Sequence, residues 1–567
     1  AGRPPQWHDV AAEAGITALN HSGKPAQKDW IVSGMGGGTI CFDYDSDGDM
    51  DLLIVDGTML TEDGVLEYSD EMRTRLYRND SSEHGGRLRF TEVTKEAGID
   101  IQAFGFGGAS CDYDADGHPD VYVCPGGPNF VLRNRGDGTF EDVTAAAGLR
   151  GLDDDMSTAC SWGDLNGDGI HDVYVSNYID QWAFIAYCKE NGLPGRHCNW
   201  RGFKVYCGPP GLTAQPDRLY FGNGDGTFRE VTTTHLRDQI NRYGFTSIMT
   251  DVDNDGDLDI YVANDTQGNF LWINDGQGSF VDRGVEAGVA SNGDVQDQAG
   301  MGVDAADLDW DGLIELTVTN FSHDHNTLYL NQTRRADQPL FRDASHAFNI
   351  ARLSYERLCW GTKMFDMDFD SDLDILVACG HVYGEIDNFA KETGTTYEQQ
   401  VLLLRNTGAP RYRMEDVTDA SGPALQVRRV WRGATFGDFD DDGDVDVFMT
   451  ALNGKPGLFR NDRVDDNAFL RFRLQGQGMQ RDPAGARVYV TLRDGRVLWH
   501  ELHHGASFCS DNDPRLFFGT GAEEVVPRVE IRWRSGDPQV FTDVPTRRMY
   551  RVEQGRDELL PDEPGAR

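Results

Sequence analysis

The sequence predicts an all-β protein: a seven-bladed β-propeller closed by its N-terminal strand, followed by a small C-terminal β-rich domain. Three observations indicate this fold class. An acidic pattern, Asp-x-Asp-x-Asp-Gly-x-x-Asp, recurs seven times along the 567 residues, three times with one substitution, one of which is an Asn that keeps an oxygen ligand. A short run of β-branched and aromatic residues, typical of a strand, follows each copy. Further strand-like runs recur at fixed places between the copies, so each repeat unit carries the four strands of a propeller blade.

The acidic pattern is typical of a loop that binds a cation through oxygen atoms. Side chains at positions one, three, five and nine and the main-chain carbonyl of position seven supply hard oxygen ligands. The glycine at position six permits the sharp turn around the ion. Magnesium prefers a tighter octahedral shell, and zinc or copper would require His or Cys at the ligand positions. We therefore predict calcium as the cofactor, with up to seven ions.

Each loop offers four ligating side chains and one carbonyl, the carbonyl belonging to the fourth residue of each set. The predicted ligands are Asp43, Asp45, Asp47, Asp49 and Asp51; Asp112, Asp114, Asp116, His118 and Asp120; Asp164, Asn166, Asp168, Ile170 and Asp172; Asp251, Asp253, Asp255, Asp257 and Asp259; Asp307, Asp309, Asp311, Leu313 and Glu315; Asp366, Asp368, Asp370, Asp372 and Asp374; and Asp438, Asp440, Asp442, Asp444 and Asp446. An EF-hand is excluded because helical flanks and a Glu at position twelve are missing.

Two loops besides the one with Asn166 depart from the pattern. Glu315 replaces the ninth Asp of the fifth loop, and Ser371 replaces the glycine of the sixth. Because a side chain disfavours the left-handed turn that glycine adopts easily, we expect the sixth loop to be strained or altered.

The other strands of the repeat are equally regular. Glycine-rich strands precede the loops, as in 36–41, 105–111 and 433–437, and strands ending in Asn follow them, as in 76–79 and 271–274. Tight turns then lead to a fourth strand of the type Phe-x-Asp/Glu-Val-Thr. These fourth strands begin at Phe90, Phe140, Phe228, Phe280, Phe341 and Met414, and a divergent copy spans residues 7–10.

The divergent copy predicts how the ring closes. The last unit has no fourth strand of its own after Asn461. The segment from Trp7 to Val10 would supply that strand, so that the last sheet has no unpaired edge strand. The predicted domains are a propeller at 1–463, with insertions at about 178–217 and 380–400, a β domain at 464–560 and a disordered tail at 561–567.

Composition limits the partners. The chain has 52 Lys and Arg against 94 Asp and Glu, a formal net charge of -42, which repels nucleic acid and anionic membranes. With 39% hydrophobic residues in strand-like patterns it is not an acidic disordered chain. No apolar stretch is long enough for a membrane span. Open acidic loops need the high calcium found outside the cytosol, so we expect a secreted protein, extracellular or periplasmic, whose signal peptide has been removed.

Seven of the ten cysteines fall into two groups. Cys188, Cys198 and Cys207 cluster in the insertion of the third unit, where a disulfide is favoured over free thiols and the third Cys pairs elsewhere or stays reduced. The cysteines on first strands are expected to be small buried core residues: Cys41, Cys111, Cys160 and Cys359.

Two short motifs match known signatures, but their surroundings favour other interpretations. His500-Glu501-Leu502-His503-His504 fits the His-Glu-x-x-His pattern of zinc proteases, which requires a helix, yet its flanks alternate like a strand. Two residues four apart on a strand stand about 13 Å apart and cannot share a zinc ion. Arg135-Gly136-Asp137 spells a cell-adhesion tripeptide but coincides with the hairpin turn of the repeat.

The two insertions could meet on one face of the ring. His197, Cys188, Cys198, Cys207 and His381 would then converge as a soft-metal or catalytic site; disulfides and a hydrogen-bonded His are the favoured alternative.

The repeats resemble the FG-GAP or VCBS repeats of integrin α-subunit propellers and many secreted bacterial proteins. The segments 485–488, 517–521 and 529–536, with the closing Val552-Glu553, resemble the ASPIC/UnbV domain. This combination is similar to that of the cartilage acidic protein family and its bacterial relatives, over about residues 7–555. Arg534 departs from the family pattern, which has Pro before Ser-Gly. The resemblance implies a secreted calcium-binding propeller.

Two function classes follow. The first is a binding, scaffold or adhesion-type module for a protein or glycan, since no nucleophile motif, phosphate loop or acid/base pair stands outside the acidic loops. The second is an exported enzyme with a site at the mouth of the propeller channel, where His381, Tyr383 and His197 are the weak catalytic candidates. Fold alone does not decide between the two.

Overall fold

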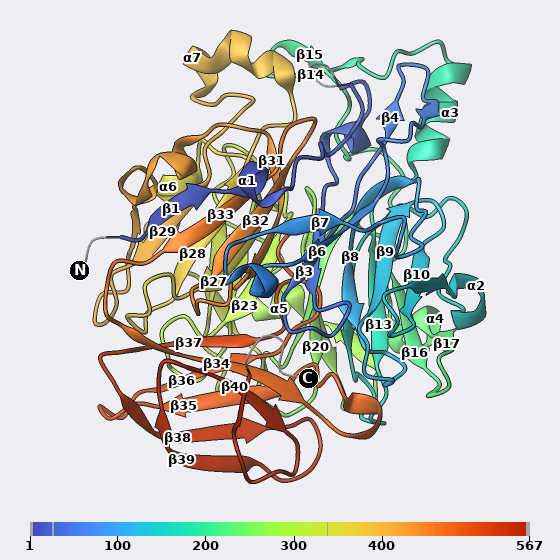
Figure 1. Ribbon diagram of the computed structural model, residues 1–567. Helices are drawn as coiled ribbons and strands as arrows, with labels where there is room; N and C mark the ends of the chain where they lie inside the picture. Colours follow the sequence, from blue (N-terminus) through green and yellow to red (C-terminus); the bar gives the residue numbers. More distant parts are fainter. Residues whose placement is uncertain (1–3, 25–27, 337, 563–567) are drawn as a thin grey trace.

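The computed structural model describes residues 4–24, 28–336 and 338–562, and its architecture is all-β and propeller-like (Figure 1). In the described part of the chain the repeat units form seven sheets, each with four antiparallel strands, and one of them gains a short parallel strand. The first three sheets contain β2 (Thr39–Phe42), β3 (Asp51–Ile54), β6 (Arg75–Asn79) and β7 (Phe90–Glu92); β8 (Phe104–Cys111), β9 (Asp120–Gly126), β10 (Phe130–Asn134) and β11 (Phe140–Asp142); and β12 (Ser157–Gly163), β13 (Asp172–Asn177), β16 (Arg218–Gly222) and β17 (Phe228–Glu230).

The remaining four sheets repeat this order. They contain β19 (Gly244–Thr250), β20 (Asp259–Asn264), β21 (Phe270–Asn274) and β22 (Phe280–Asp282), with the added β18 (Leu236–Arg237); β23 (Val303–Ala306), β24 (Glu315–Val318), β25 (Thr327–Asn331) and β26 (Phe341–Asp343); β27 (Cys359–Phe365), β28 (Asp374–Cys379), β29 (Leu402–Asn406) and β30 (Met414–Asp416); and β31 (Trp431–Gly437), β32 (Asp446–Ala451), β33 (Gly457–Asp462) and β1 (Gln6–Asp9).

The two ends of the repeat region pair with each other. β1 runs antiparallel to β33, with Trp7 opposite Asn461, and the Trp7 side chain is fully buried. The first strands of successive sheets contact one another in chain order, and β31 of the last sheet contacts β2 of the first. One apolar cluster joins Phe448 and Leu458 of the last sheet to Leu52 and Tyr77 of the first. The hydrophobic core therefore continues between the first and last sheets.

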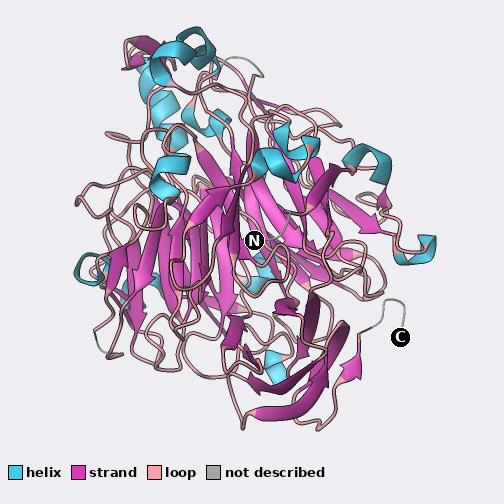
Figure 2. Ribbon diagram, turned by 90° about the vertical axis from the view of Figure 1, so that its left-hand side faces the viewer, coloured by secondary structure: helices cyan, strands magenta, loops and turns pink. Residues whose placement is uncertain are grey.

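The insertions gather at the end of the molecule opposite the C-terminal strands (Figures 1 and 2). They comprise α3 (Gln181–Glu190), β14 (Cys198–Trp200) and β15 (Phe203–Val205) in the third unit, η3 (Gly384–Phe389) and α7 (Ala390–Thr393) in the sixth, and β4 (Met59–Leu60) and β5 (Leu66–Glu67) in the first. The other short helical segments are α1 (Ala11–Ala14), η1 (Ile31–Gly34), η2 (Ser82–His84), α2 (Thr144–Ala147), α4 (Thr232–His235), α5 (Gly284–Ala287), α6 (Ile350–Ser354), η4 (Thr418–Ser421), η5 (Pro423–Gln426) and η6 (Gly478–Gln480).

The C-terminal region folds into two four-stranded sheets around their own apolar core. One contains β34 (Ala468–Gln475), β37 (Leu516–Gly521), β40 (Arg548–Glu553) and β41 (Leu560–Pro561), and the other β35 (Arg487–Thr491), β36 (Val497–Glu501), β38 (Val525–Arg532) and β39 (Gln539–Pro545). The start of the predicted disordered tail is wrong: Pro561 lies in β41, and Asp562 forms ion pairs with Arg471 and Arg473. Residues 563–567 lie outside the described part.

The loop between β36 and β37 enters the ring of first strands. We call residues 503–513 the channel segment. It forms isolated bridges to three first strands, Trp162–His504, Val303–Ser507 and Ile40–Asp511. Hydrogen bonds reach the other four, through Ser110, Thr246, Thr362 and Ala434.

Glycines of the first strands leave room for this segment. A Cβ atom added at Gly38 or at Gly107 would lie 1.9 Å from the carbonyl oxygen of Cys509. Ser507, Phe508 and Cys509 are fully buried. The glycine-rich first strands therefore fit a centre that the chain itself fills.

Candidate metal sites and the insertion cavity

The seven acidic loops each connect the first and second strands of a sheet and bring their carboxylates together. In four of them, three carboxylate oxygens lie within 4.8 Å of one another: those of Asp43, Asp45 and Asp51; Asp112, Asp114 and Asp120; Asp251, Asp253 and Asp255; and Asp307, Asp309 and Asp311. The predicted clustering of these side chains is present in the structure.

Two hydrogen bonds recur in every loop. The N–H of position six donates to the carboxylate of position one, as from Gly48 to Asp43 at 3.1 Å. The N–H of position seven donates to the carboxylate of position five, as from Asp49 to Asp47 at 2.9 Å. Both bonds wrap the backbone around the acidic side chains, which is the geometry a cation loop requires.

The ninth residue holds the loop to its sheet. In six of the loops its two carboxylate oxygens accept backbone N–H groups, one from position two and one from the end of the third strand. Glu315 keeps both bonds, at 2.8 and 3.2 Å, so the longer side chain preserves the pattern.

Several carboxylate oxygens of the loops are buried without a hydrogen-bond partner in the described structure. At position one these are Oδ1 of Asp43, Asp112 and Asp438, and at position three Oδ1 of Asp253, Asp309, Asp368 and Asp440. Burial and neighbouring carboxylates raise the pKa of Asp112, Asp253 and Asp440 to about 7. A bound cation would supply the partner that these buried oxygens lack. The donor set fits calcium.

The backbone of position four was not predicted. It is left-handed in all seven loops, with φ between 54° and 73°, and only Gly167 is a glycine: the others are Ser46, Ala115, Asn254, Trp310, Phe369 and Asp441. Ser371 at position six also has a φ of 76° and keeps its N–H bond to Asp366 at 2.8 Å. The sixth loop therefore retains the turn of the others at the cost of a strained serine.

The C-terminal domain contacts the first residue of every loop. Arg473, Arg487 and Arg471 pair with Asp43, Asp251 and Asp438 at 2.9, 3.3 and 2.9 Å. Gln480 and Trp499 donate to Asp164 and Asp307 at 2.9 and 2.6 Å. The two other contacts are the Asp112 N–H donating to Asp482 at 3.4 Å and Asp366 lying against Gly519. Sequence reasoning missed this set because the contacting residues share no motif.

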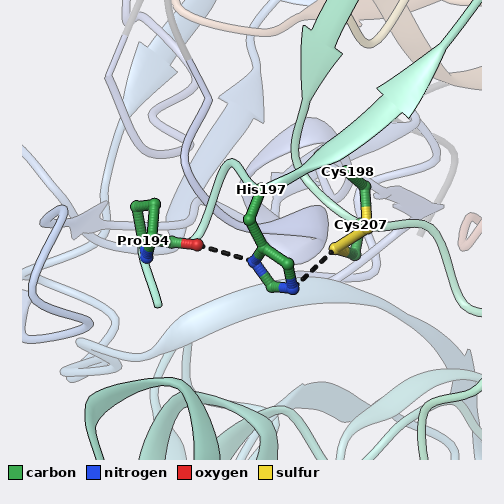
Figure 3. The surroundings of a disulfide bond; sticks show 4 residues. All are labelled: Pro194, His197, Cys198 and Cys207. Atoms are coloured by element: carbon green, nitrogen blue, oxygen red, sulfur yellow. Dashed lines mark hydrogen bonds between the residues drawn. A yellow bond between two sulfur atoms is a disulfide. The ribbon is translucent and has the colours of Figure 1, made fainter. Parts of the chain in front are cut away.

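The disulfide expected in the third-unit insertion is present. Cys198 and Cys207 are bonded to each other (Figure 3). Cys188 is a buried free cysteine. His197 donates from Nδ1 to the Pro194 carbonyl at 2.7 Å, and its Nε2 lies 3.4 Å from Cys207 Sγ (Figure 3). Because the sulfur atoms of Cys198 and Cys207 are bonded to each other, the structure favours the disulfide over a soft-metal site built from the cysteines and histidines of the insertions.

His381 is a buried structural residue in this geometry. It is fully buried, its Nδ1 accepts the Tyr383 N–H at 3.1 Å, and its Nε2 donates to Ser322 Oγ at 3.2 Å. Burial, with Arg432 nearby, holds the pKa of His381 well below its usual range. Since Nδ1 accepts, the ring proton sits on Nε2, and the imidazole cannot take a proton from Ser322.

The two insertions meet on one face. The rings of Trp200 and His381 lie 5.7 Å apart, Phe203 stacks on Phe389 at 4.4 Å, and Arg196 pairs with Glu385. Beneath them lies a cavity of about 440 Å³, which we call the insertion cavity. Its lining includes Trp200, Tyr206, Asp265, Phe321, His323, Asp324, Trp360 and Tyr383. Asp265, His323 and Asp324 were not singled out from the sequence, since they lie in different repeat units.

The remaining sequence motifs are the zinc-protease pattern, the cell-adhesion tripeptide and the cysteines of the first strands. His500 is in strand β36, against the rings of Trp310 and Phe518, so the zinc-protease interpretation lacks its helix. Gly136 lies in the turn between β10 and β11. The four first-strand cysteines are buried, as expected. Among the described residues no helix is both long and apolar enough to span a bilayer.

Comparison with known proteins adds a family context. The family described as ASPIC and UnbV matches residues 476–559, and the FG-GAP-like repeat matches residues 112–175 and 251–318. Cartilage acidic protein 1 of Mus musculus is 24% identical over 560 residues, covering 94% of this chain and 76% of the relative. The Homo sapiens protein is 24% identical over 548 residues, covering 93% and 73%.

Solved structures are similar at lower levels. An Agrocybe aegerita lectin that recognises non-reducing terminal N-acetylglucosamine is 14% identical, with a TM-score of 0.37, covering 74% of this chain and 87% of the lectin. The Dos1 propeller is 9% identical, with a TM-score of 0.35, covering 82% and 97%. The chain is thus a protein with FG-GAP-like repeats and an ASPIC and UnbV domain, similar over most of its length to cartilage acidic protein 1.

Proposed function

We propose that the chain is an exported, calcium-binding, seven-bladed propeller that acts as a binding or scaffold module for a protein or glycan. The observation that carries the binding role is the insertion cavity, which two insertions from different repeat units build together around aromatic side chains. Concave sites with aromatic walls and a few polar groups are the usual form of ligand sites.

The seven-bladed ring rests on three observations. Seven four-stranded sheets follow one another, their first strands are in contact from β2 round to β31, and β1 supplies the last strand of the final sheet. We keep the boundary between a propeller at 1–463 and a C-terminal domain from residue 464, which extends through β41 to residue 562, although the channel segment of the second lies inside the first.

The proposal of calcium binding rests on the buried carboxylate oxygens of the loops that lack a hydrogen-bond partner in the described structure. The ligands would be the side chains at positions one, three, five and nine and the carbonyl of position seven. Bound calcium would neutralise carboxylates that otherwise repel one another and would thus stabilise the loops.

Calcium removal tests this assignment. At a free calcium concentration of about ten times Kd, each site adds about 1.4 kcal/mol to the free energy of unfolding. We therefore expect EGTA to lower Tm by many degrees, and calcium but not an equal concentration of magnesium to restore it. A melting curve that EGTA leaves unchanged would exclude the assignment.

Export is supported by the disulfide and by the chemistry of the loops. Disulfides persist in oxidising compartments, and open acidic loops match the calcium concentrations found outside the cytosol. The relatives carry the name of an extracellular tissue, cartilage.

The binding role can be tested at one side chain. Trp200→Ala removes the ring at the centre of the cavity wall, whereas Tyr187→Ala removes an exposed ring from α3 of the same insertion. On arrays of glycans and extracellular proteins in calcium, we expect Trp200→Ala to lose the ligands of the wild type and Tyr187→Ala to keep them. Equal binding by both variants would overturn the assignment of the cavity.

The exported-enzyme alternative is less well supported. It relied on His381, which is buried and holds the tautomer that cannot act as a base toward Ser322. A binding role requires no such base, so the geometry supports it better.

A further inference from the structure

Three aromatic rings form one wall of the insertion cavity. The ring centroid of Trp200 lies 5.8 Å from that of Tyr383 and 6.1 Å from that of Phe321, and the centroids of Phe321 and Tyr383 are 6.3 Å apart. All three side chains line the cavity. Aromatic rings attract cations through the negative charge of their faces. Trp200 already shows this property, since the guanidinium of the exposed Arg201 lies 5.2 Å from its ring centroid. The wall therefore suits a positively charged group.

Two carboxylates line the same cavity, and the guanidinium of Arg201, which also lines it, forms no ion pair with either of them. Asp265 is only 7% exposed and accepts a hydrogen bond from Tyr178 Oη at 2.6 Å, while Asp324 is half-buried. In the described part of the chain no Lys or Arg nitrogen lies within 4.0 Å of either carboxylate. Burial, together with the charge of Asp324, raises the pKa of Asp265 to about 7. A cation bound beside these two carboxylates would offset the cost of burying Asp265 as an anion.

A histidine adds a further acceptor. His323 lines the cavity and lies with Nε2 2.8 Å from the Thr393 carbonyl, to which it donates. Its Nδ1 is then a lone-pair acceptor, and this atom is buried without a hydrogen-bond partner in the described structure. Asp265, Asp324 and His323 together present acceptors, which disfavours an anion and favours a ligand with donors and positive charge.

We propose that the insertion cavity binds an organic cation, an ammonium group carried on a small apolar body. The ring faces of the aromatic wall would contact both the apolar body and the ammonium group. Asp265 and Asp324 would neutralise the charge of that group. The ammonium group that enters the cavity belongs either to a free small molecule or to a side group of a larger protein or glycan. This inference rests on the proposed binding role of the same cavity and specifies the chemistry it recognises.

Matched small molecules test the charge. Binding of choline, 2-phenylethylammonium and 3,3-dimethylbutan-1-ol, the neutral isostere of choline, would be measured by calorimetry and tryptophan fluorescence on the full chain in calcium. The variants are Asp265→Asn and Asp324→Asn, with Asp294→Asn as a control at an exposed carboxylate. Because Asn has the same shape as Asp, the changes remove charge and keep the cavity.

We expect both cations to bind and the alcohol to bind at least about tenfold more weakly. Asp265→Asn should weaken the cations by about tenfold, and Asp294→Asn should leave them unchanged. Equal binding of choline and its isostere, unchanged binding in Asp265→Asn, or no binding of either cation would overturn the proposal. If the array ligands still depend on Trp200 in that case, the binding role stands and only the cation is wrong.

Discussion

Asn79 donates a hydrogen bond from Nδ2 to the main-chain carbonyl of Phe439 at 2.8 Å, across 360 residues of sequence. The Asn belongs to the third strand of the first sheet, and the carbonyl belongs to position two of the last acidic loop. The same bond joins other neighbouring sheets, as from Asn134 to Tyr44 and from Asn274 to Leu165, each at 2.7 Å. The first and last sheets are thus linked like any other pair.

This equivalence predicts the effect of two matched substitutions. Asn79→Ala and Asn134→Ala each leave buried carbonyls without a donor, which costs about 1–3 kcal/mol for each carbonyl. We expect similar losses in the free energy of unfolding, measured by urea denaturation in calcium. A much smaller loss for Asn79→Ala would indicate that the first and last sheets are not held as the others are.

The strained serine of the sixth loop predicts a stabilising substitution. Ser371 holds a left-handed conformation that costs a residue with a side chain about 1–2 kcal/mol. We expect Ser371→Gly to raise the free energy of unfolding in calcium by about 1 kcal/mol. The gain is smaller than the relieved strain because glycine has more entropy in the unfolded chain. Gly312→Ser, at the same position of the fifth loop, should lower the free energy of unfolding. A Ser371→Gly variant that is less stable than the wild type would contradict the strain at Ser371.

The glycines around the channel segment predict a steric effect. A methyl group at Gly107 would overlap the Cys509 carbonyl, whereas at Gly208 it would lie 3.6 Å from Pro210, an ordinary contact. We expect Gly107→Ala to cost more than about 2 kcal/mol, and Gly208→Ala to change stability little. Thermal unfolding of both variants in calcium measures the difference, and equal Tm values would argue against a filled centre.

A buried ion pair predicts a loss of stability at alkaline pH. Burial alone lowers the pKa of His504, but the carboxylate of Asp482, 2.9 Å from Nε2, and that of Asp511 raise it to about 9. The folded pKa exceeds the unfolded value of about 6.5. The contribution is therefore complete below pH 6.5 and lost as pH rises through 9.

We expect the Tm of the wild type in calcium to fall between pH 7 and pH 9.5. His504→Gln, which cannot be charged, should start lower and fall less over this range. Parallel curves for the two proteins would show that the charge of His504 does not stabilise the fold.

Much of the repeat could be predicted because it is periodic. The acidic loops, the four strands of each unit and the pairing of Trp7 with the last sheet all follow from residues that recur at fixed spacing. A disulfide in the insertion of the third unit was also predicted, although the sequence did not show that Cys198 and Cys207, and not Cys188, form it.

Contacts between non-equivalent segments could not be predicted in this way. Asp265 and Asp324 come from different units and share no motif, so only the fold shows that they line one cavity. The left-handed backbone at position four has no residue signature, because Trp310, Phe369 and Ala115 adopt it alike. The glycines at 38 and 107 were visible, but their reason lies in Cys509, some 400 residues away.

The channel segment also bears on the order in which the chain can fold as it is synthesised. Residues 503–513 emerge after all seven first strands, yet they contact every one of those strands at the centre. The earliest strand, β1, must likewise wait for β33. Such distant pairings are slow to form. The seven sheets therefore lack their central contacts until residue 513 has been made, and a product that ends before residue 503 would leave the centre unfilled.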